Sequence, residues 1–289
     1  MPNLRSIRKR IGSVKSTQQI TKAMKMVSAA KLRRAQEAIV AARPYARKMR
    51  DVVQGLARRA GAEAHPLLAR REAKRLALVV ITSDRGLCGS FNSGLLRMAH
   101  RYYLDNADRY EEIRVFAVGR KGRDFFRRRL GAVHKEYMNV LSTVSYAHAE
   151  RIAHDLVEGF LAGEHDEVVV AFNEFRSAIS QRPGFETLFP IAVEAKAEEG
   201  GADIDYLYEP SRKEILEALL PKYIETQIFR FLLESVAGEH GARMTAMDSA
   251  TNNAVEMIAR LTLQMNRARQ AAITKELMEI IGGAEALKG

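Results

Sequence analysis

Apolar residues in the first 60 positions recur at steps of three and four, and lysine and arginine occupy many of the positions between them. The stripe comprises Ile7, Ile11, Val14, Ile20, Met24, Val27, Leu32, Ala35 and Ile39. Such spacing predicts one long helix with an apolar face. The stripe changes phase between Val14 and Ile20, which predicts an irregular coiled coil. Because a basic helix of this length is not stable alone in water, we expect it to pack against another helix.

The pattern changes at residue 76, where short apolar runs alternate with helical periods. Strands are predicted at the starts of 75–92 and 112–131, across 166–175 and within 186–193. Helices are predicted at 91–104 and 146–161, and a basic helix follows the glycine turn inside 112–131. This alternation predicts a small, mainly parallel α/β sheet.

Helical periodicity returns at residue 211 and continues almost to the end of the chain. Ser211 and Glu214 form the S-x-x-E pattern of a helix N-terminus. Pro221 is expected to kink or restart this helix. Gly238 and Gly241 are expected to weaken its middle by roughly 1 kcal/mol each relative to alanine.

Two long terminal helices therefore bracket one α/β region, and their economical arrangement is an antiparallel pair with facing stripes. The predicted fold is α/β: a long antiparallel coiled coil of the N- and C-terminal helices plus a small Rossmann-like domain with a mainly parallel sheet. The expected segments are 1–70, 76–208 and 211–286. The C-terminal helix is the longer of the two, so its tip is expected to project past its partner.

That tip, QAAITKELMEIIGGAEAL at residues 270–287, has too much apolar surface for a single helix in water. Its apolar side chains wrap around more than one face of the helix: Ala271, Ala272, Ile273, Leu277, Met278, Ile280 and Ile281. Charges are few, so the sequence raises the question of what encloses this helix.

Charge divides the chain more sharply than its total of +11 suggests. Residues 1–75 hold 20 Lys and Arg against 4 Asp and Glu, a balance of +16, whereas 76–210 carry −5 and 211–289 are neutral. A basic arm attracts nucleic acid, anionic lipid or an acidic protein surface. No apolar run reaches the roughly 18 residues of a membrane span, and the start lacks the apolar stretch of a secretory signal.

No pattern in the sequence predicts a catalytic, cofactor or metal site. The glycine turn at 83–92 lacks the Gly-Lys-Ser/Thr ending of a phosphate loop, so a structural turn is favoured over nucleotide binding. Cys88, the single cysteine, has no Cys-His signature and is expected to be a small buried residue. The seven histidines show no metal-ligand spacing. A small α/β enzyme with helical arms remains a hypothesis that nucleotide titration would test.

Other polar and charged positions have plain structural interpretations. The arginines at 127–129 fit a solvated helix C-terminus. Met24 fits a coiled-coil core, and Arg243 and Gln270 fit exposed polar positions. A basic coiled coil that binds nucleic acid is an alternative function, although Tyr45 is the only aromatic residue in the basic arm.

Four segments resemble the gamma subunit of F-type ATP synthase, in the expected order and over nearly the whole chain. Three are STQQITKAMKMVSAAKLRRAQ at 16–36, ITSDRGLCGSFN at 81–92 and ARMTAMDSATNNA at 242–254. In the fourth, the family's C-terminal signature positions are occupied by Ile273, Thr274, Glu276, Glu279, Gly283, Ala284 and Ala286. Residues 93–210 share the strand pattern more than individual residues.

The resemblance implies a non-catalytic rotor shaft with no cofactor of its own. In the family, the two long helices turn inside a ring of three alpha and three beta subunits, and the C-terminal end sits in an apolar sleeve. An acidic loop of the beta subunit pushes against the shaft, and ATP chemistry stays on beta. The lower α/β domain contacts the epsilon subunit and the c-ring, so contact with the membrane is indirect.

The resemblance also assigns contact positions. The beta-subunit contacts are expected at Met24, Arg243, Gln270, Thr274 and Glu276. The c-ring and epsilon contacts are expected at Tyr206, Tyr208 and Glu209. Arg243→Ala is expected to weaken coupling in the complex while the isolated chain stays folded. The single cysteine excludes the cysteine pair of the chloroplast form, and the start favours a bacterial chain at the cytoplasmic face of the plasma membrane.

Overall fold

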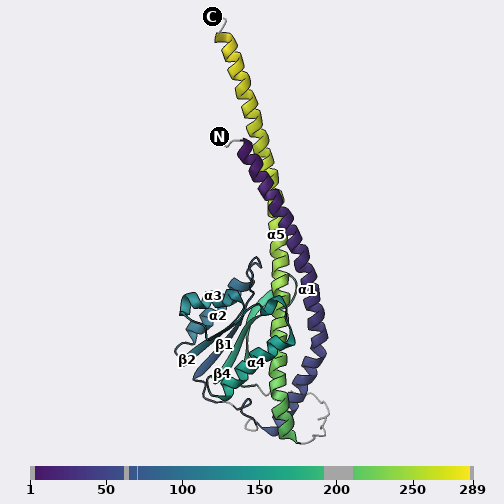
Figure 1. Cartoon of the computed structure of the whole chain (residues 1–289), viewed down its shortest axis with the longest axis vertical. Helices are drawn as coiled ribbons and strands as arrows, with labels where there is room; N and C mark the ends of the chain where they lie inside the picture. The colour runs from purple at the N-terminus through teal and green to yellow at the C-terminus, as the bar shows by residue number, and fades with distance from the viewer. Residues whose placement is uncertain (1–3, 62–64, 70, 192–210, 287–289) are drawn as a thin grey trace. The chain divides into compact units, whose positions relative to one another are not determined.

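The computed structural model describes residues 4–61, 65–69, 71–191 and 211–286. Contacts divide the chain into two compact units. The coiled-coil unit comprises Met1–Ser28 and Met244–Gly289, and the sheet unit comprises Ala29–Arg243. Two long helices contribute to both units: α1 (Leu4–Ala60) and α5 (Arg212–Ala286) (Figure 1).

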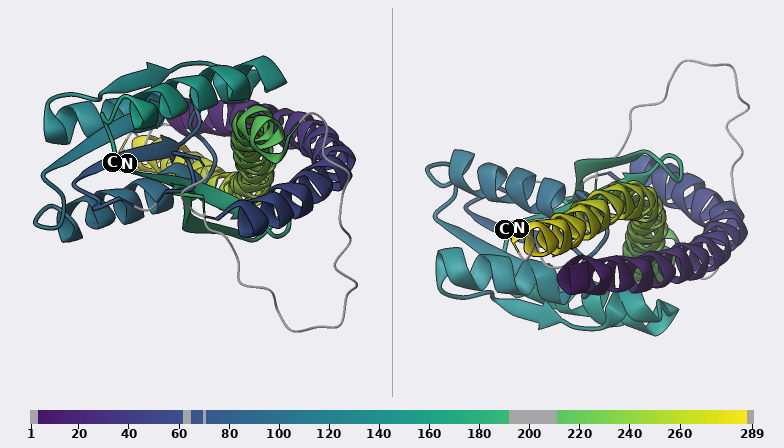
Figure 2. Two further views of the ribbon diagram at one scale, coloured as in Figure 1. Left: turned by 90° about the horizontal axis from the view of Figure 1, so that it is seen from below. Right: turned by 90° about the horizontal axis from the view of Figure 1, so that it is seen from above.

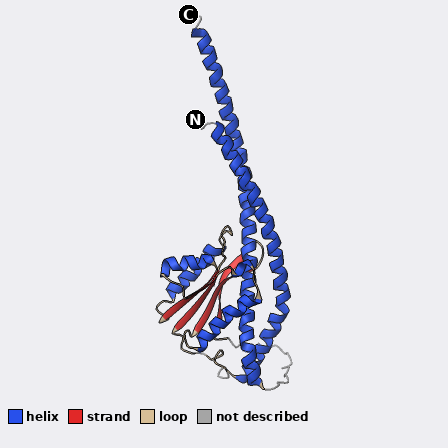
Figure 3. Cartoon of the chain, viewed as in Figure 1, coloured by secondary structure: helices blue, strands red, loops and turns tan. Residues whose placement is uncertain are grey.

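The sheet unit contains a five-stranded sheet in the order β3-β2-β1-β4-β5 (Figure 3). Its strands are β1 (Arg75–Ile81), β2 (Glu112–Val118), β3 (Lys135–Tyr137), β4 (Glu167–Phe175) and β5 (Gln181–Phe189). β1 pairs in parallel with β2 and β4, β2 pairs in parallel with β3, and β5 runs antiparallel to β4. The apolar run of β1 is buried from Leu76 to Ile81, as expected for a central parallel strand. The predicted, mainly parallel sheet is confirmed.

Helices cover both faces of this sheet (Figure 2). On one face, α2 (Phe91–Asp105) and α3 (Arg120–Leu130) share a core with Leu76, Leu78 and Val80 of β1. On the other face, the alternate β1 residues share a core with α4 (Tyr146–Leu161) and with parts of α1 and α5. A short 3-10 helix, η1 (Val140–Ser142), precedes α4. Because strand side chains alternate between faces, β1 contributes to two separate cores.

Most predicted elements are present, with two corrections. The three-residue strand β3 was missed, because its sequence Lys-Glu-Tyr carries no apolar run. A restart at Pro221 was wrong, because α5 continues through this residue as one helix. The predicted N-terminal cap of α5 is confirmed, since the Glu214 N–H donates to the Ser211 hydroxyl at 3.2 Å.

The two glycines in the middle of α5 lie close to α2 and to the turn between β4 and β5. A Cβ atom at Gly238 would lie 3.2 Å from the Phe91 ring, and one at Gly241 would lie 2.9 Å from the Ala178 carbonyl oxygen. The absence of a side chain at both positions therefore allows close packing. This packing offsets the weakening expected from the helix propensity of glycine alone.

The seam of the coiled-coil unit has a regular spacing, so the predicted change of phase was wrong. Buried or half-buried positions on α1 include 7, 11, 14, 18, 21, 25 and 28. Those on α5 include 247, 251, 254, 258, 261, 265, 268 and 272. Both sets follow alternating steps of four and three, the 3.5-residue repeat of a coiled coil.

Some seam positions carry polar side chains, which is why the stripe of apolar residues suggested a change of phase. The Thr21 and Thr251 hydroxyls form a hydrogen bond of 2.8 Å, and the Lys25 ammonium lies 2.6 Å from the Asp248 carboxylate. These two pairs also establish that α1 and α5 are antiparallel in this unit. A half-exposed ion pair contributes less than about 1 kcal/mol, but polar seam residues help to fix the register.

Candidate functional site

The coiled-coil unit keeps several large apolar side chains outside its seam. Ile20 and Val27, which the sequence pattern placed in the stripe, are 59% and 58% exposed. Further exposed apolar residues of this unit are Met26, Val255, Met257 and Leu263. A strict 3.5-residue count from Ile7 passes through Thr21 and Ser28 and would have placed Ile20 and Val27 on the outside. These residues are candidate contact positions that sequence reasoning missed.

The C-terminal end of α5 extends beyond the N-terminus of α1 (Figure 1). The register set by Thr21 and Thr251 brings Leu4, the first described residue of α1, level with about Ala268. Every residue from Ile273 to Ala284 is exposed. The prediction that the tip projects past its partner is confirmed.

This projecting tip is apolar on several sides, and its charged residues between Ile273 and Ala284 are Lys275, Glu276 and Glu279. Its exposed large side chains are Ile273, Leu277, Met278, Ile280 and Ile281, and Ile280 reaches 71% exposure. An ion pair within the helix joins Lys275 and Glu279 at 3.5 Å. Contiguous exposed apolar surface is typical of an interaction site. A single helix of this kind fits a partner that surrounds it.

The positions predicted to contact partners occupy different environments. Met24 is half-buried on α1, whereas Gln270, Thr274 and Glu276 are exposed on α5 within the coiled-coil unit. The exposed position predicted for Gln270 is therefore confirmed. Tyr206, Tyr208 and Glu209 lie outside the described residues.

Arg243 belongs to the sheet unit and is buried, so its interpretation as an exposed polar residue was wrong. Its side chain is 9% exposed and lies 2.7 Å from the Glu239 carboxylate. Its guanidinium also donates to the Gly86 carbonyl oxygen at 3.2 Å and lies 3.3 Å from His240 Nδ1. The physical reason for burial is this set of partners, which satisfies the guanidinium inside the chain. Arg243 thus ties α5 to the turn at 83–92.

Ionisation in this cluster is governed by burial. Burial and the neighbouring Arg243 cation lower the pKa of His240 to about 4, so the imidazole is neutral at pH 7. Burial raises the pKa of Glu239, while the Arg243 cation opposes that shift. A neutral histidine beside an ion pair produces no nucleophile or metal site by itself.

The turn at 83–92 is engaged within the chain. The Ser83 N–H donates to the Asn92 side-chain oxygen at 3.0 Å, and the Phe91 N–H donates to the Cys88 carbonyl at 3.1 Å. Cys88 is buried, as predicted, and burial raises the pKa of its thiol. In doubly wound sheets a nucleotide occupies the crevice beyond the carboxyl ends of the strands. Here α5 packs against this region through Gly238, Gly241 and Arg243, which favours the structural interpretation of the turn.

Other candidate chemistry is not assembled in the described part of the chain. Within the described ranges, no three His, Cys, Asp or Glu residues are arranged to hold a metal ion. The arginines at 127–129 are exposed, as predicted, and Arg129 stacks 3.9 Å above the Phe125 ring centre. Among the described helices, none combines the length and apolar character needed to cross a bilayer.

Deleting residues 280–289 is expected to change the free energy of unfolding of the isolated chain by less than about 0.5 kcal/mol, because residues 280–284 are exposed. Thermal and urea denaturation would measure this change. Leu261→Ala provides the matched control: Leu261 is 7% exposed in the same unit, and its truncation is expected to cost about 2 kcal/mol. A deletion as costly as the Leu261 substitution would show that the tip stabilises its own chain.

Comparison with known proteins gives a consistent result. Residues 3–287 match a family model described as ATP synthase. The ATP synthase gamma chain of Trichlorobacter lovleyi is 57% identical over 291 residues, with 100% of both chains covered.

Solved structures show the same fold. A chain in the central stalk and c-ring structure of Tetrahymena thermophila mitochondrial ATP synthase is 28% identical, with a TM-score of 0.60 over 80% of this chain and 99% of that chain. A chain of Euglena gracilis mitochondrial ATP synthase has a TM-score of 0.72, covering 98% of this chain and 94% of that one. At 21% identity, this second similarity supports the fold alone.

Proposed function

This chain belongs to the ATP synthase gamma-chain family, and from that membership we infer that it is the central rotor shaft of an F-type ATP synthase. It is a non-catalytic subunit, and the catalytic sites lie on the beta subunits. The structural observation that carries this assignment is the projecting tip of α5, whose residues from Ile273 to Ala284 are exposed. A slim, apolar and sparsely charged helix suits rotation inside an enclosing sleeve.

The partners are three alpha and three beta subunits around the shaft, together with the epsilon subunit and the c-ring. Ion flow turns the c-ring, and the shaft turns with it. Since the shaft is asymmetric, each beta subunit meets a different face at each moment. The three nucleotide sites are thereby biased towards different affinities, a population shift that is driven mechanically.

The chain's own surface supports two modes of contact. The exposed apolar residues outside the seam, such as Ile20 and Val27, offer area for burial against surrounding subunits. The basic face of α1 suits the acidic loop of a beta subunit, because complementary charge steers and orients association. The nucleic-acid alternative explains the second feature alone, and the sequence and structural relatives offer it no support.

Individual contacts are proposed by family resemblance. Met24, Arg243, Gln270, Thr274 and Glu276 are assigned to the beta-subunit region, and Tyr206, Tyr208 and Glu209 to the c-ring and epsilon region. For Arg243, the intrachain contacts support an additional role in positioning the 83–92 turn. The proposed functional segments are 1–70, 76–208 and 211–286, and the proposed location is the cytoplasmic face of a bacterial plasma membrane, with attachment through the c-ring.

Native mass spectrometry of the material that co-purifies with this chain, after nuclease treatment, tests the assignment. We expect one copy with three copies each of two nucleotide-binding subunits, and ATPase activity that the chain alone lacks. A chain that loses its partner on nuclease treatment would instead support the nucleic-acid alternative.

Leu277→Asp probes the tip within the assembled complex. Leu277 is 56% exposed, so the isolated chain is expected to keep its stability, whereas the carboxylate would oppose entry into an apolar sleeve. We expect ATP synthesis to fall several-fold relative to Leu277→Met, a control that keeps the same exposed position apolar. Unchanged synthesis and assembly of the Leu277 variant would contradict the sleeve model.

A further inference from the structure

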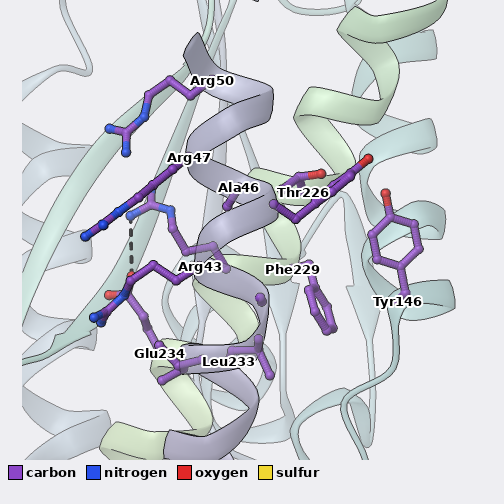
Figure 4. Close-up of a pocket in the computed structure, with 13 residues that line it drawn as sticks. Arg43, Ala46, Arg47, Arg50, Tyr146, Thr226, Phe229, Leu233 and Glu234 are labelled. Atoms are coloured by element: carbon purple, nitrogen blue, oxygen red, sulfur yellow. Dashed lines mark hydrogen bonds and ion pairs between the residues drawn. The ribbon is translucent and has the colours of Figure 1, made fainter. Parts of the chain in front are cut away.

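A cavity of about 610 Å³ lies between α1 and α5 inside the sheet unit (Figure 4). This volume is within the roughly 300–1,000 Å³ of small-molecule sites. The cavity arises because α1 presents Ala42 and Ala46, one turn apart, near Phe229 and Leu233 of α5. Two small side chains leave space between the helices that larger residues would fill. The result is an apolar chamber that the rotary function does not explain.

One mouth of the chamber is strongly cationic. Arg43, Arg47 and Arg50 line it from α1, at steps of four and three along one helix face. Figure 4 shows all three side chains projecting from the same side of α1. No carboxylate of the described residues forms an ion pair with any of the three. All three arginines are exposed on α1, so their guanidinium groups are accessible to a bound anion, which they would hold by charge-assisted hydrogen bonds.

The fourth arginine of the lining differs from these three. Arg230 of α5 is paired with Glu186, and its guanidinium lies 3.4 Å from the Glu234 carboxylate. Its charge is thus already compensated by acidic partners. The uncompensated charge of the chamber is concentrated on the α1 side.

The opposite side of α1 offers an uncharged boundary. Figure 4 shows Phe229, Thr226 and Tyr146 on that side. The rings of Tyr146 and Phe229 meet edge to face, with centroids 5.6 Å apart. Burial and the Glu225 carboxylate raise the pKa of Tyr146 to about 12, so its hydroxyl is neutral at physiological pH. The chamber therefore has one cationic mouth, an apolar middle and a neutral aromatic side.

We propose that this chamber binds a single-chain anionic amphiphile. Its carboxylate or phosphate head group pairs with Arg43, Arg47 and Arg50, and its hydrocarbon tail lies between α1 and α5 against Ala42, Ala46 and Leu233. Charge complementarity selects an anion over a cation, and the apolar lining selects a tail over a free inorganic anion. The two head groups share the same recognition chemistry, because guanidinium groups bind both in bidentate geometry. The proposal stands independently of the rotor assignment.

Isothermal titration of the full-length chain with dodecanoate, below its micelle concentration, tests the proposal. Saturable binding at one site is expected, and dodecyl phosphate is included to distinguish the two head groups. Dodecyltrimethylammonium has the same tail with a cationic head, and acetate has the carboxylate without the tail. Both are expected to bind at least about tenfold more weakly.

Two kinds of variant test separately how the arginine charge and the cavity volume contribute to dodecanoate binding. Arg47→Gln removes one guanidinium and is expected to weaken dodecanoate binding about tenfold, because one charge-assisted interaction is lost. Ala46→Leu fills the chamber without changing charge and is expected to weaken binding by a similar factor. Arg34→Gln is the matched control, since Arg34 is also an exposed arginine of α1 and does not line the chamber. Its affinity is expected to match that of the unsubstituted chain.

Several results would overturn the proposal. Equal binding of the cationic amphiphile, or equal weakening by Arg47→Gln and Arg34→Gln, would indicate a nonspecific detergent-like interaction. Unchanged affinity in Ala46→Leu would place the tail elsewhere. Circular dichroism of each variant checks that the fold is retained, and a variant that loses helicity is replaced by Arg43→Gln or Ala42→Leu at the neighbouring turn.

Discussion

Gly119→Ala is expected to lower the free energy of unfolding of the sheet unit by about 4 kcal/mol or more. Gly119 follows β2 and has a φ of 90°, a conformation that glycine adopts readily and other residues avoid. A Cβ atom there would overlap the Thr82 carbonyl oxygen and lie 2.8 Å from its carbonyl carbon. These are backbone atoms at the end of the central strand, so the clash is not relieved by rotating a side chain.

The surrounding hydrogen bonds prevent a cheap rearrangement. The Gly119 N–H donates to the Tyr137 carbonyl at 2.8 Å, and the Thr82 hydroxyl accepts from the Gly122 N–H at 2.8 Å. The same hydroxyl donates to the Val118 carbonyl at 3.0 Å. Movement away from the clash would break bonds that connect β1, β2, β3 and α3.

Gly131→Ala is the matched control for Gly119→Ala. Gly131 has a φ of 78°, but a Cβ atom there would have open space around it, with no atom within 4 Å beyond its own chain neighbours. Its substitution is expected to cost about 1 kcal/mol, the strain of the left-handed conformation alone. Urea denaturation followed by hydrogen exchange of the β1 and β2 amides would measure both variants. Equal costs at the two glycines would show that the Thr82 contact yields easily.

The sequence predicted most elements of the sheet unit because buried strands and helices need apolar residues at characteristic spacings. β1 and β4 are apolar runs of the length that a central strand needs, and the helices around them keep a 3.6-residue period. β3 has three residues and forms a strand because it pairs with β2, and this pairing is not visible in the local sequence pattern. The role of Gly119 was likewise hidden, since it depends on contact with Thr82, distant in sequence.

The coiled-coil unit shows why apolar periodicity alone was an insufficient guide. Its seam includes Thr21 and Lys25, while Ile20 and Val27 face outward. A chain that functions inside an assembly satisfies two demands at once: it must pair its helices and also present apolar surface to other subunits. The apolar pattern of one chain contains residues of both kinds, so the outward-facing Ile20 and Val27 were assigned to the seam.

Two sequence-based predictions for the candidate site had opposite results: the projection of the tip is confirmed, and the exposed position of Arg243 is wrong. The tip was predictable, because apolar residues on several helix faces cannot all be buried by one partner helix. Arg243 was not, because its i, i+4 spacing from Glu239 also occurs on exposed helix faces and does not indicate that the pair is buried. Its pairing with Glu239 follows helical spacing, but its contact with Gly86 depends on the tertiary fold.

Arg243→Met is expected to lower the free energy of unfolding of the isolated chain by about 3 kcal/mol, because it leaves the Glu239 carboxylate buried without its cation. Both side chains of this pair are less than one tenth exposed, at 9% and 8%. The sequence-based expectation for Arg243→Ala was that the isolated chain stays folded, and the buried pair adds that the folded chain is less stable. A loss of coupling in the complex is therefore assignable to a partner contact only after the stability of the variant is matched.

The cost of Arg243→Met is expected to depend on pH. Without the cation, burial and the nearby Asp84 carboxylate raise the pKa of Glu239 further above its unfolded value, with the Lys31 cation opposing. A carboxyl group with a raised pKa in the fold favours the folded state at low pH and loses that contribution as pH rises through the folded pKa. His240 acts in the same direction, since removal of the Arg243 cation raises its lowered pKa. The variant is thus less impaired at pH 5 than at pH 8.

A double-mutant cycle with Glu239→Gln isolates the pair. In the Glu239→Gln background, Arg243→Met is expected to cost at least about 1 kcal/mol less at pH 8, because no buried carboxylate is left uncompensated. Urea denaturation of the four chains at pH 5 and pH 8 gives the coupling free energy and its pH dependence. Equal costs of Arg243→Met in both backgrounds would assign the stabilisation to the Gly86 contact, which the methionine side chain removes in either case.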